Sequence, residues 1–197
     1  MGAWQQDASI STPCHGPKRP PTLPMNSPTS TPAKPAAATP ARAAAALLAR
    51  HWDGKLPVDP LRIAAALGIR VVARGGADDP DYAYSGYFDN SGGQPVIEYN
   101  RGESVVRQRF TLAHELGHYA LGHASSPRDT PANFTTGVSD KAERQANRFA
   151  AELLMPAKEV RIVVQGGLFK DVAELAGAFH TSQAAMVYRL QSLGLIP

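Results

Sequence analysis

The pattern of apolar and polar residues predicts two long helices in the middle of the chain. Between residues 103 and 121, apolar side chains occur around most of a helical projection, which is typical of a helix buried on nearly all sides. Gly122 is expected to end this helix. Residues 140–155 keep their apolar positions mainly to one face, and Pro156 ends that second helix. The two helices form the expected centre of the fold.

Shorter segments complete the predicted fold. Helical spacing predicts short helices near residues 41–52 and 61–69, and two or three more after the second long helix. Residues 69–75 are expected to form a strand, and residues 84–89 and 94–100 a hairpin joined by a glycine-rich turn. The sequence therefore predicts an α+β fold that is mostly helical, with a small antiparallel sheet and a C-terminal helical subdomain.

The first 38 residues differ in composition from the rest of the chain. Eight prolines lie there among Ser, Thr, Ala and Lys, a composition that buries too little apolar surface to fold. We expect a disordered tail over residues 1–38, a folded domain over residues 39–156 and the helical subdomain over residues 157–197. Cys14, the single cysteine, falls in the tail, so neither a disulfide nor a thiolate metal site is expected.

The formal net charge of +3 gives little support for nucleic-acid binding. Residues 1–50 hold five Lys or Arg and one Asp, a net +4, which leaves 15 basic and 16 acidic residues, a net −1, in residues 51–197. No broad basic surface is expected on the folded part. Because no apolar run approaches about 18 residues and the N-terminus has no hydrophobic signal segment, we expect a cytoplasmic protein without a membrane span.

The first long helix contains His114-Glu115-Leu116-Gly117-His118, the H-E-x-x-H pattern. Two imidazoles four residues apart project from one face of a helix and can share one Zn²⁺ ion. Glu115 lies roughly 100° around the helix, too far to be an equal third ligand but placed to act as a general base on a water beside the metal. Buried ionisable groups cost several kcal/mol unless something satisfies them, and a bound metal would do so.

A third protein ligand must come from another part of the chain. His123 falls beyond the expected helix end and does not fit the spacing of longer three-histidine motifs, so we interpret it as a helix-terminal residue. In the second long helix, Glu143 borders the apolar face, whereas Glu152 lies roughly opposite and is expected to face water. The alternative for Glu143 is a capping box with Asp140. We favour Glu143 as the ligand, because two histidines and a glutamate form a known catalytic zinc site.

The segments "RQRFTLAHELGHYALGH" and "AERQANRFAAELLMP" together resemble the ImmA/IrrE family of zinc metallopeptidases over roughly residues 40–195. The resemblance implies a zincin-like fold with Zn²⁺ on His114, His118 and Glu143, and Glu115 as catalytic base. It also implies an endopeptidase that cuts helix-turn-helix repressors of phage, mobile-element or DNA-damage genes and so relieves repression. The repressor is expected to be a separate protein that is cut in trans.

Two features of a peptidase site stay open at the level of sequence. The hairpin before the metal helix is expected either to hold an extended substrate or only to cover the core. An oxyanion donor is also normally required. Candidates for the oxyanion donor are Tyr82, Tyr84, Tyr87, Arg107 and His180.

Two alternatives compete with the peptidase interpretation. Residues 171–196 resemble a helix-turn-helix, but Arg189 is the single charged side chain of its second helix, residues 183–193. Phosphate contacts supply most of the affinity of such modules. Direct nucleic-acid binding is therefore not expected. The other alternative is a non-catalytic, zinc-stabilised regulator or toxin–antitoxin partner. Glu115 argues against it, because a structural zinc site does not need a general base.

Overall fold

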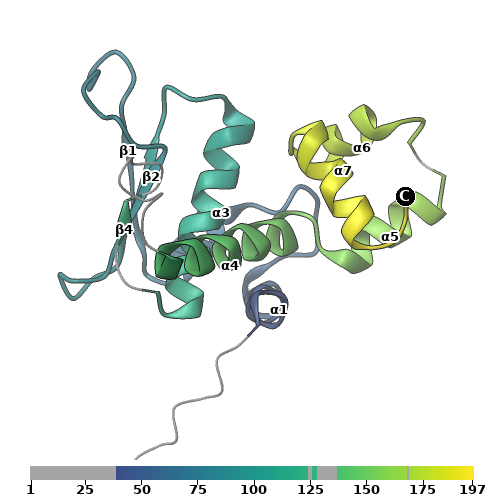
Figure 1. The fold of residues 1–197 in the computed structure, drawn as a ribbon, viewed down its shortest axis with the longest axis horizontal. Coiled ribbons are helices and arrows are strands. Elements are labelled where there is room, and N and C mark those ends of the chain that lie inside the picture. Colours follow the sequence, from purple (N-terminus) through teal and green to yellow (C-terminus); the bar gives the residue numbers. More distant parts are fainter. Residues whose placement is uncertain (1–38, 124–125, 128–136, 168) are drawn as a thin grey trace, which may run out of the picture. The chain divides into compact units, whose positions relative to one another are not determined.

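The structure, a computed structural model, describes residues 39–123, 126–127, 137–167 and 169–197 (Figure 1). The tail predicted over residues 1–38 lies outside these described residues. None of the helices in the described parts of the chain combines the length and apolar character that a membrane span needs. The elements are α1 (Pro40–His51), α2 (Pro60–Ala66), β1 (Arg70–Arg74), β2 (Gly86–Asp89), β3 (Val96–Asn100), α3 (Val105–Leu121), β4 (Ser126–Pro127), α4 (Gly137–Leu154), α5 (Ala157–Gln165), α6 (Val172–Phe179) and α7 (Gln183–Ser192).

The small sheet has the strand order β1-β3-β2-β4. β2 and β3 form the predicted antiparallel hairpin, with Phe88 opposite Ile97. β1, however, pairs with β3 in parallel, so the sheet is mixed, and the expectation of a wholly antiparallel sheet is wrong at this strand. The alternation of apolar residues shows which side chains face the core but does not determine the direction of the neighbouring strand. The predicted α+β, mostly helical fold class is confirmed.

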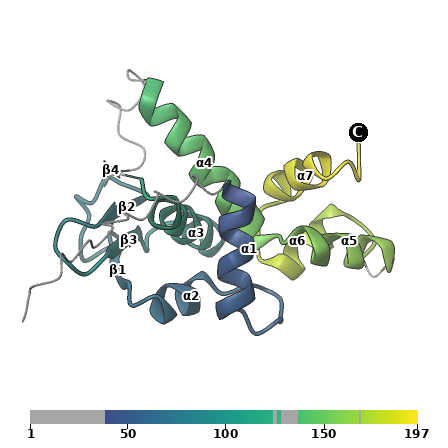
Figure 2. The ribbon, with the colours of Figure 1, turned by 90° about the horizontal axis from the view of Figure 1, so that it is seen from below.

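Helix α3 lies between the sheet and the other helices (Figures 1 and 2). It contacts β2 and β3 on one side, where the rings of Phe88 and Tyr119 meet edge to face with centroids 6.2 Å apart. On another side it contacts α4, and α1 packs against both of these helices. Residues 111–118 of α3 are all buried, as the apolar pattern predicted.

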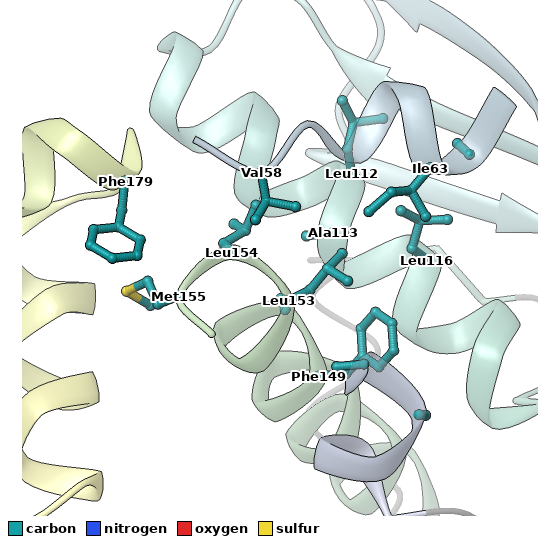
Figure 3. Packing of buried hydrophobic residues seen from close by; sticks show 14 of the residues in the cluster. Val58, Ile63, Leu112, Ala113, Leu116, Phe149, Leu153, Leu154, Met155 and Phe179 are labelled. Atoms are coloured by element: carbon teal, nitrogen blue, oxygen red, sulfur yellow. The ribbon is translucent and has the colours of Figure 1, made fainter. Parts of the chain in front are cut away.

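Small residues of α3 and α4 meet where these two helices pack together. A side chain at Gly117 would place its Cβ atom 3.1 Å from the Cα atom of Ala146 and 3.0 Å from the ring of Phe149. Ala146, Phe149 and Ala150 are fully buried, and Phe149 lies among the core side chains drawn in Figure 3. Because only small residues lie between the two backbones, α3 and α4 pack closely. Side chains on neighbouring turns of the two helices can therefore contact one another.

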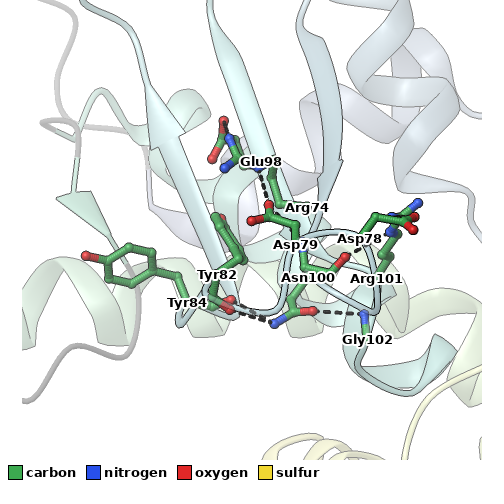
Figure 4. A network of polar contacts seen from close by, with 10 residues as sticks. Arg74, Asp78, Asp79, Tyr82, Tyr84, Glu98, Asn100, Arg101 and Gly102 are labelled. Carbon is green, nitrogen blue, oxygen red and sulfur yellow. Dashed lines mark hydrogen bonds and ion pairs between the residues drawn. The ribbon is translucent and has the colours of Figure 1, made fainter.

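Polar contacts hold the segment between β1 and β2, residues 75–85, against the end of the sheet (Figure 4). The side-chain nitrogen of Asn100 donates to the carbonyl oxygen of Tyr84 at 3.3 Å. At the end of β1, Arg74 forms an ion pair with Asp79 at 2.7 Å. These contacts determine where the chain enters β2 beside α3.

The C-terminal helices are joined to α4 by a buried ion pair. Arg189 of α7 is 4% exposed, and its guanidinium lies 2.6 Å from Glu152 Oε2 and donates to the carbonyl oxygen of Met155 at 2.9 Å. The expectation that Glu152 faces water is therefore wrong, because α7 covers this side of α4 and a projection of one helix contains no information about its neighbours. The single charged side chain of the second helix of the helix-turn-helix-like segment therefore also points inward.

Candidate metal centre

Two histidines of α3 face the same point inside the protein. The Ser104 hydroxyl caps the start of the helix by accepting a hydrogen bond from the backbone N–H of Arg107 at 3.3 Å. About three and four turns later, His114 is fully buried and His118 is 3% exposed. Their Nε2 atoms lie 3.0 Å apart. The i and i+4 spacing thus brings together the two nitrogens that the sequence analysis assigned to a metal.

Helix α4 adds a carboxylate to this pair. Glu143 Oε2 lies 3.0 Å from His114 Nε2, and Oε1 lies 3.4 Å from His118 Nε2. One donor atom from each of the three residues lies within 4.8 Å of the others. Because α4 begins at Gly137, Asp140 lies inside the helix, and the alternative of a capping box between Asp140 and Glu143 is wrong.

The donor set fits a zinc ion. Two nitrogens and one carboxylate oxygen are common zinc ligands, and ligands about 2.0 to 2.1 Å from a tetrahedral ion lie about 3.3 Å from one another. The three separations in the structure, 3.0 to 3.4 Å, are close to that value. Burial would raise the pKa of Glu143, but hydrogen bonds from the two imidazoles hold it well below its usual range. The carboxyl group is therefore ionised, as a metal ligand must be.

Glu115 lies on α3 beside these three side chains and is fully buried. The start of β2 lies close to Glu115 at Gly86, a residue outside the H-E-x-x-H motif. A Cβ atom at Gly86 would lie 2.9 Å from Glu115 Oε1 and 2.4 Å from the Cγ2 atom of Thr111. Only a glycine fits this contact without displacing the carboxylate. The signal in the sequence is a glycine inside a predicted strand, which often marks a close approach of the backbone.

Further polar side chains contact the outer ring nitrogens of both histidines. His114 Nδ1 lies 3.0 Å from Asn147 Oδ1 of α4. His118 Nδ1 lies 3.1 Å from His123 Nδ1, and His123 Nε2 lies 3.3 Å from Gln145 Oε1. Burial is the main cause that lowers the pKa of His123, and the electrostatic interaction with His118 lowers it further. The structure thus places His123 against the outer side of His118 and outside the group of three donors, and no pattern in the sequence predicts these contacts.

The five polar residues considered as oxyanion donors lie in different surroundings. Burial, and next the charge of Glu98, raise the pKa of Tyr82, and Glu115 also contributes to this rise. The ring of Tyr84 meets that of Tyr82 edge to face at 5.8 Å. His180 occupies the left-handed position after α6 and is exposed. Tyr82 thus interacts electrostatically with Glu115.

Comparisons with known proteins match the part of the chain that carries this site. Residues 64–191 match the peptidase family described as IrrE N-terminal-like domain. The chain is also 33% identical over 109 residues to Metallopeptidase ImmA of Bacillus subtilis (strain 168). That alignment covers 54% of this chain, and the chain spans 61% of the length of that relative. The family match includes α3, α4 and all four candidate site residues.

Proposed function

The chain belongs to the peptidase family of the IrrE N-terminal-like domain, and from this premise we propose that it is a zinc-dependent endopeptidase. One observation carries the proposal. Two buried imidazoles and an ionised carboxylate from different helices converge within 4.8 Å, next to the buried carboxyl group of Glu115. Three protein ligands leave a fourth position open, which is the arrangement of catalytic rather than structural zinc sites.

In this proposal His114, His118 and Glu143 hold the ion. When bound, Zn²⁺ polarises the substrate carbonyl group and lowers the pKa of water to about 7. Glu115 accepts a proton from the water that adds to the carbonyl carbon. As the carbon–nitrogen bond breaks, the same carboxyl group returns the proton to the leaving amine. Its burial shields this proton transfer from bulk solvent.

We further propose that the substrate is a helix-turn-helix repressor encoded separately, whose cleavage relieves repression. The resemblance to the ImmA/IrrE family supports this substrate class. We propose that the chain itself does not bind the operator DNA. Residues 51–197 are nearly neutral in charge, and Arg189 points inward. We assign the peptidase to residues 39–156, a flanking subdomain to residues 157–197 and a disordered tail to residues 1–38.

The test incubates zinc-loaded protein with the repressor encoded nearest to its own gene, followed by mass spectrometry of the products. Glu115→Gln is the matched control, because it keeps the size of the side chain but cannot carry the proton. Discrete fragments made by the wild type and not by Glu115→Gln support the proposal. An intact repressor held in a stable complex by both proteins would instead support the non-catalytic regulator.

A further inference from the structure

The turn at the end of α3 brings His123 into contact with His118, a proposed zinc ligand. Gly122 has a left-handed backbone conformation, with φ 67°. Its N–H bonds to the carbonyl oxygen of Tyr119 at 3.2 Å, and the next N–H, that of His123, bonds to the carbonyl oxygen of His118 at 2.9 Å. These two bonds form a Schellman motif, which folds the second residue after the helix back over its last turn.

The imidazole of His123 uses this position to contact the outer side of His118. The ring centroids lie 5.0 Å apart with an interplanar angle of 71°, and the two Nδ1 atoms are 3.1 Å apart. The other nitrogen of His123 lies 3.3 Å from Gln145 Oε1, two residues after Glu143 on α4. The backbone and side chain of His123 thus both bond to His118, and α4 supports the ring from behind.

When the site holds a metal, one arrangement of protons satisfies the contacts of His118 and His123. His118 Nε2 faces His114 and Glu143, so it must carry a lone pair to bind a metal, and its proton must lie on Nδ1. That N–H donates to His123 Nδ1. The proton of His123 then lies on Nε2 and donates to the oxygen of Gln145.

We infer that His123 is a positioning residue that fixes the proton of His118 on Nδ1 and orients its ring for metal binding. The inference rests on the proposed function, because it assumes that His118 is a ligand. His118 lies in the last turn of α3, where intrahelical hydrogen bonds run out, so an added contact has most effect there. Asn147 makes the corresponding contact with His114, which lies a turn deeper in the helix.

The experiment measures the zinc affinity of full-length variants by competition with a chromophoric chelator. His123→Phe keeps a ring but removes the acceptor, and we expect about 10- to 100-fold weaker binding, as is usual when an outer partner of a metal ligand is lost. His123→Asn retains an acceptor oxygen and should recover part of the loss. His51→Phe, at the end of α1, is the control and should bind as the wild type does. Gln145→Leu, which removes the support of His123, should cause a smaller loss.

A nitrogen-15 spectrum of the zinc-loaded wild type gives a second readout, with the proton of His118 on Nδ1 and metal on Nε2. Unchanged affinity in both His123→Phe and Gln145→Leu would overturn the inference while leaving the proposed function intact. Loss of zinc from His123→Phe as complete as from His114→Ala would also overturn it, because His123 would then be a ligand. A wild type that binds no zinc would overturn the proposed function itself.

Discussion

At the scale of single residues, the contact between Gly86 and Glu115 makes a local prediction. Gly86→Ala adds a methyl group where the structure leaves 2.9 Å to Glu115 Oε1, so the carboxylate must move. A misplacement of about 1 Å can cost about 10²-fold in rate, and we expect a loss of peptidase activity of that order with unchanged zinc content. Gly92→Ala is the control, because a Cβ atom there meets nothing within 4 Å. Full activity of Gly86→Ala in a kinetic assay would show that the contact does not constrain Glu115.

The chemistry of Glu115 itself gives a second prediction at this scale. Glu115→Gln preserves the shape of a fully buried side chain but removes its ability to accept and return a proton. General acid–base catalysis is worth about 10² to 10⁴ in rate, so the turnover number should fall by that factor. Zinc content and melting temperature, measured on the same preparation, should stay close to those of the wild type. A variant that cleaves as fast as the wild type would exclude Glu115 as the base.

At the scale of elements, the pair Arg189–Glu152 joins α7 to α4 and predicts a loss of stability. Arg189→Met leaves Glu152, which is 16% exposed, without its partner. Removing one member of a buried ion pair costs about 3 to 5 kcal/mol, which lowers the melting temperature of a chain of this size by at least about 6 °C. Calorimetry checks this, with Arg189→Met/Glu152→Leu expected to recover most of the loss because two apolar side chains replace the buried charges. An unchanged melting temperature in Arg189→Met would mean that the ion pair does not contribute to the stability of the folded protein.

The same scale shows what the sequence could predict and where it failed. The 3.6-residue period sets the direction of each side chain on its own helix, and it placed His114, His118 and Glu143 correctly on the inner faces of α3 and α4. The parallel pairing of β1 and the burial of Glu152 depend on which elements become neighbours. Contacts of this kind join residues far apart in the chain, and no pattern within one segment contains them. A glycine inside a predicted strand indicates a close approach at Gly86 but does not identify Glu115 as the partner.

At the scale of the whole molecule, composition predicts that the tail contributes little to the stability of the folded part. Deleting residues 1–38 removes eight prolines and few apolar side chains capable of forming a core. The melting temperature should change by less than about 2 °C, equivalent to under roughly 1 kcal/mol. Differential scanning calorimetry of the full and shortened chains measures this. A clear fall in melting temperature would show that the tail packs against the folded part.

The metal content of the purified full-length protein tests the central claim most directly. Elemental analysis after purification without chelators should find one zinc ion per chain, because three donors from α3 and α4 converge on one point. His114→Ala and Glu143→Ala should lose the metal, whereas Glu174→Gln, an exposed change on α6, should retain it. Circular dichroism confirms that each variant is folded. Substoichiometric zinc that His114→Ala and Glu143→Ala leave unchanged would contradict the metal site and the peptidase mechanism built on it.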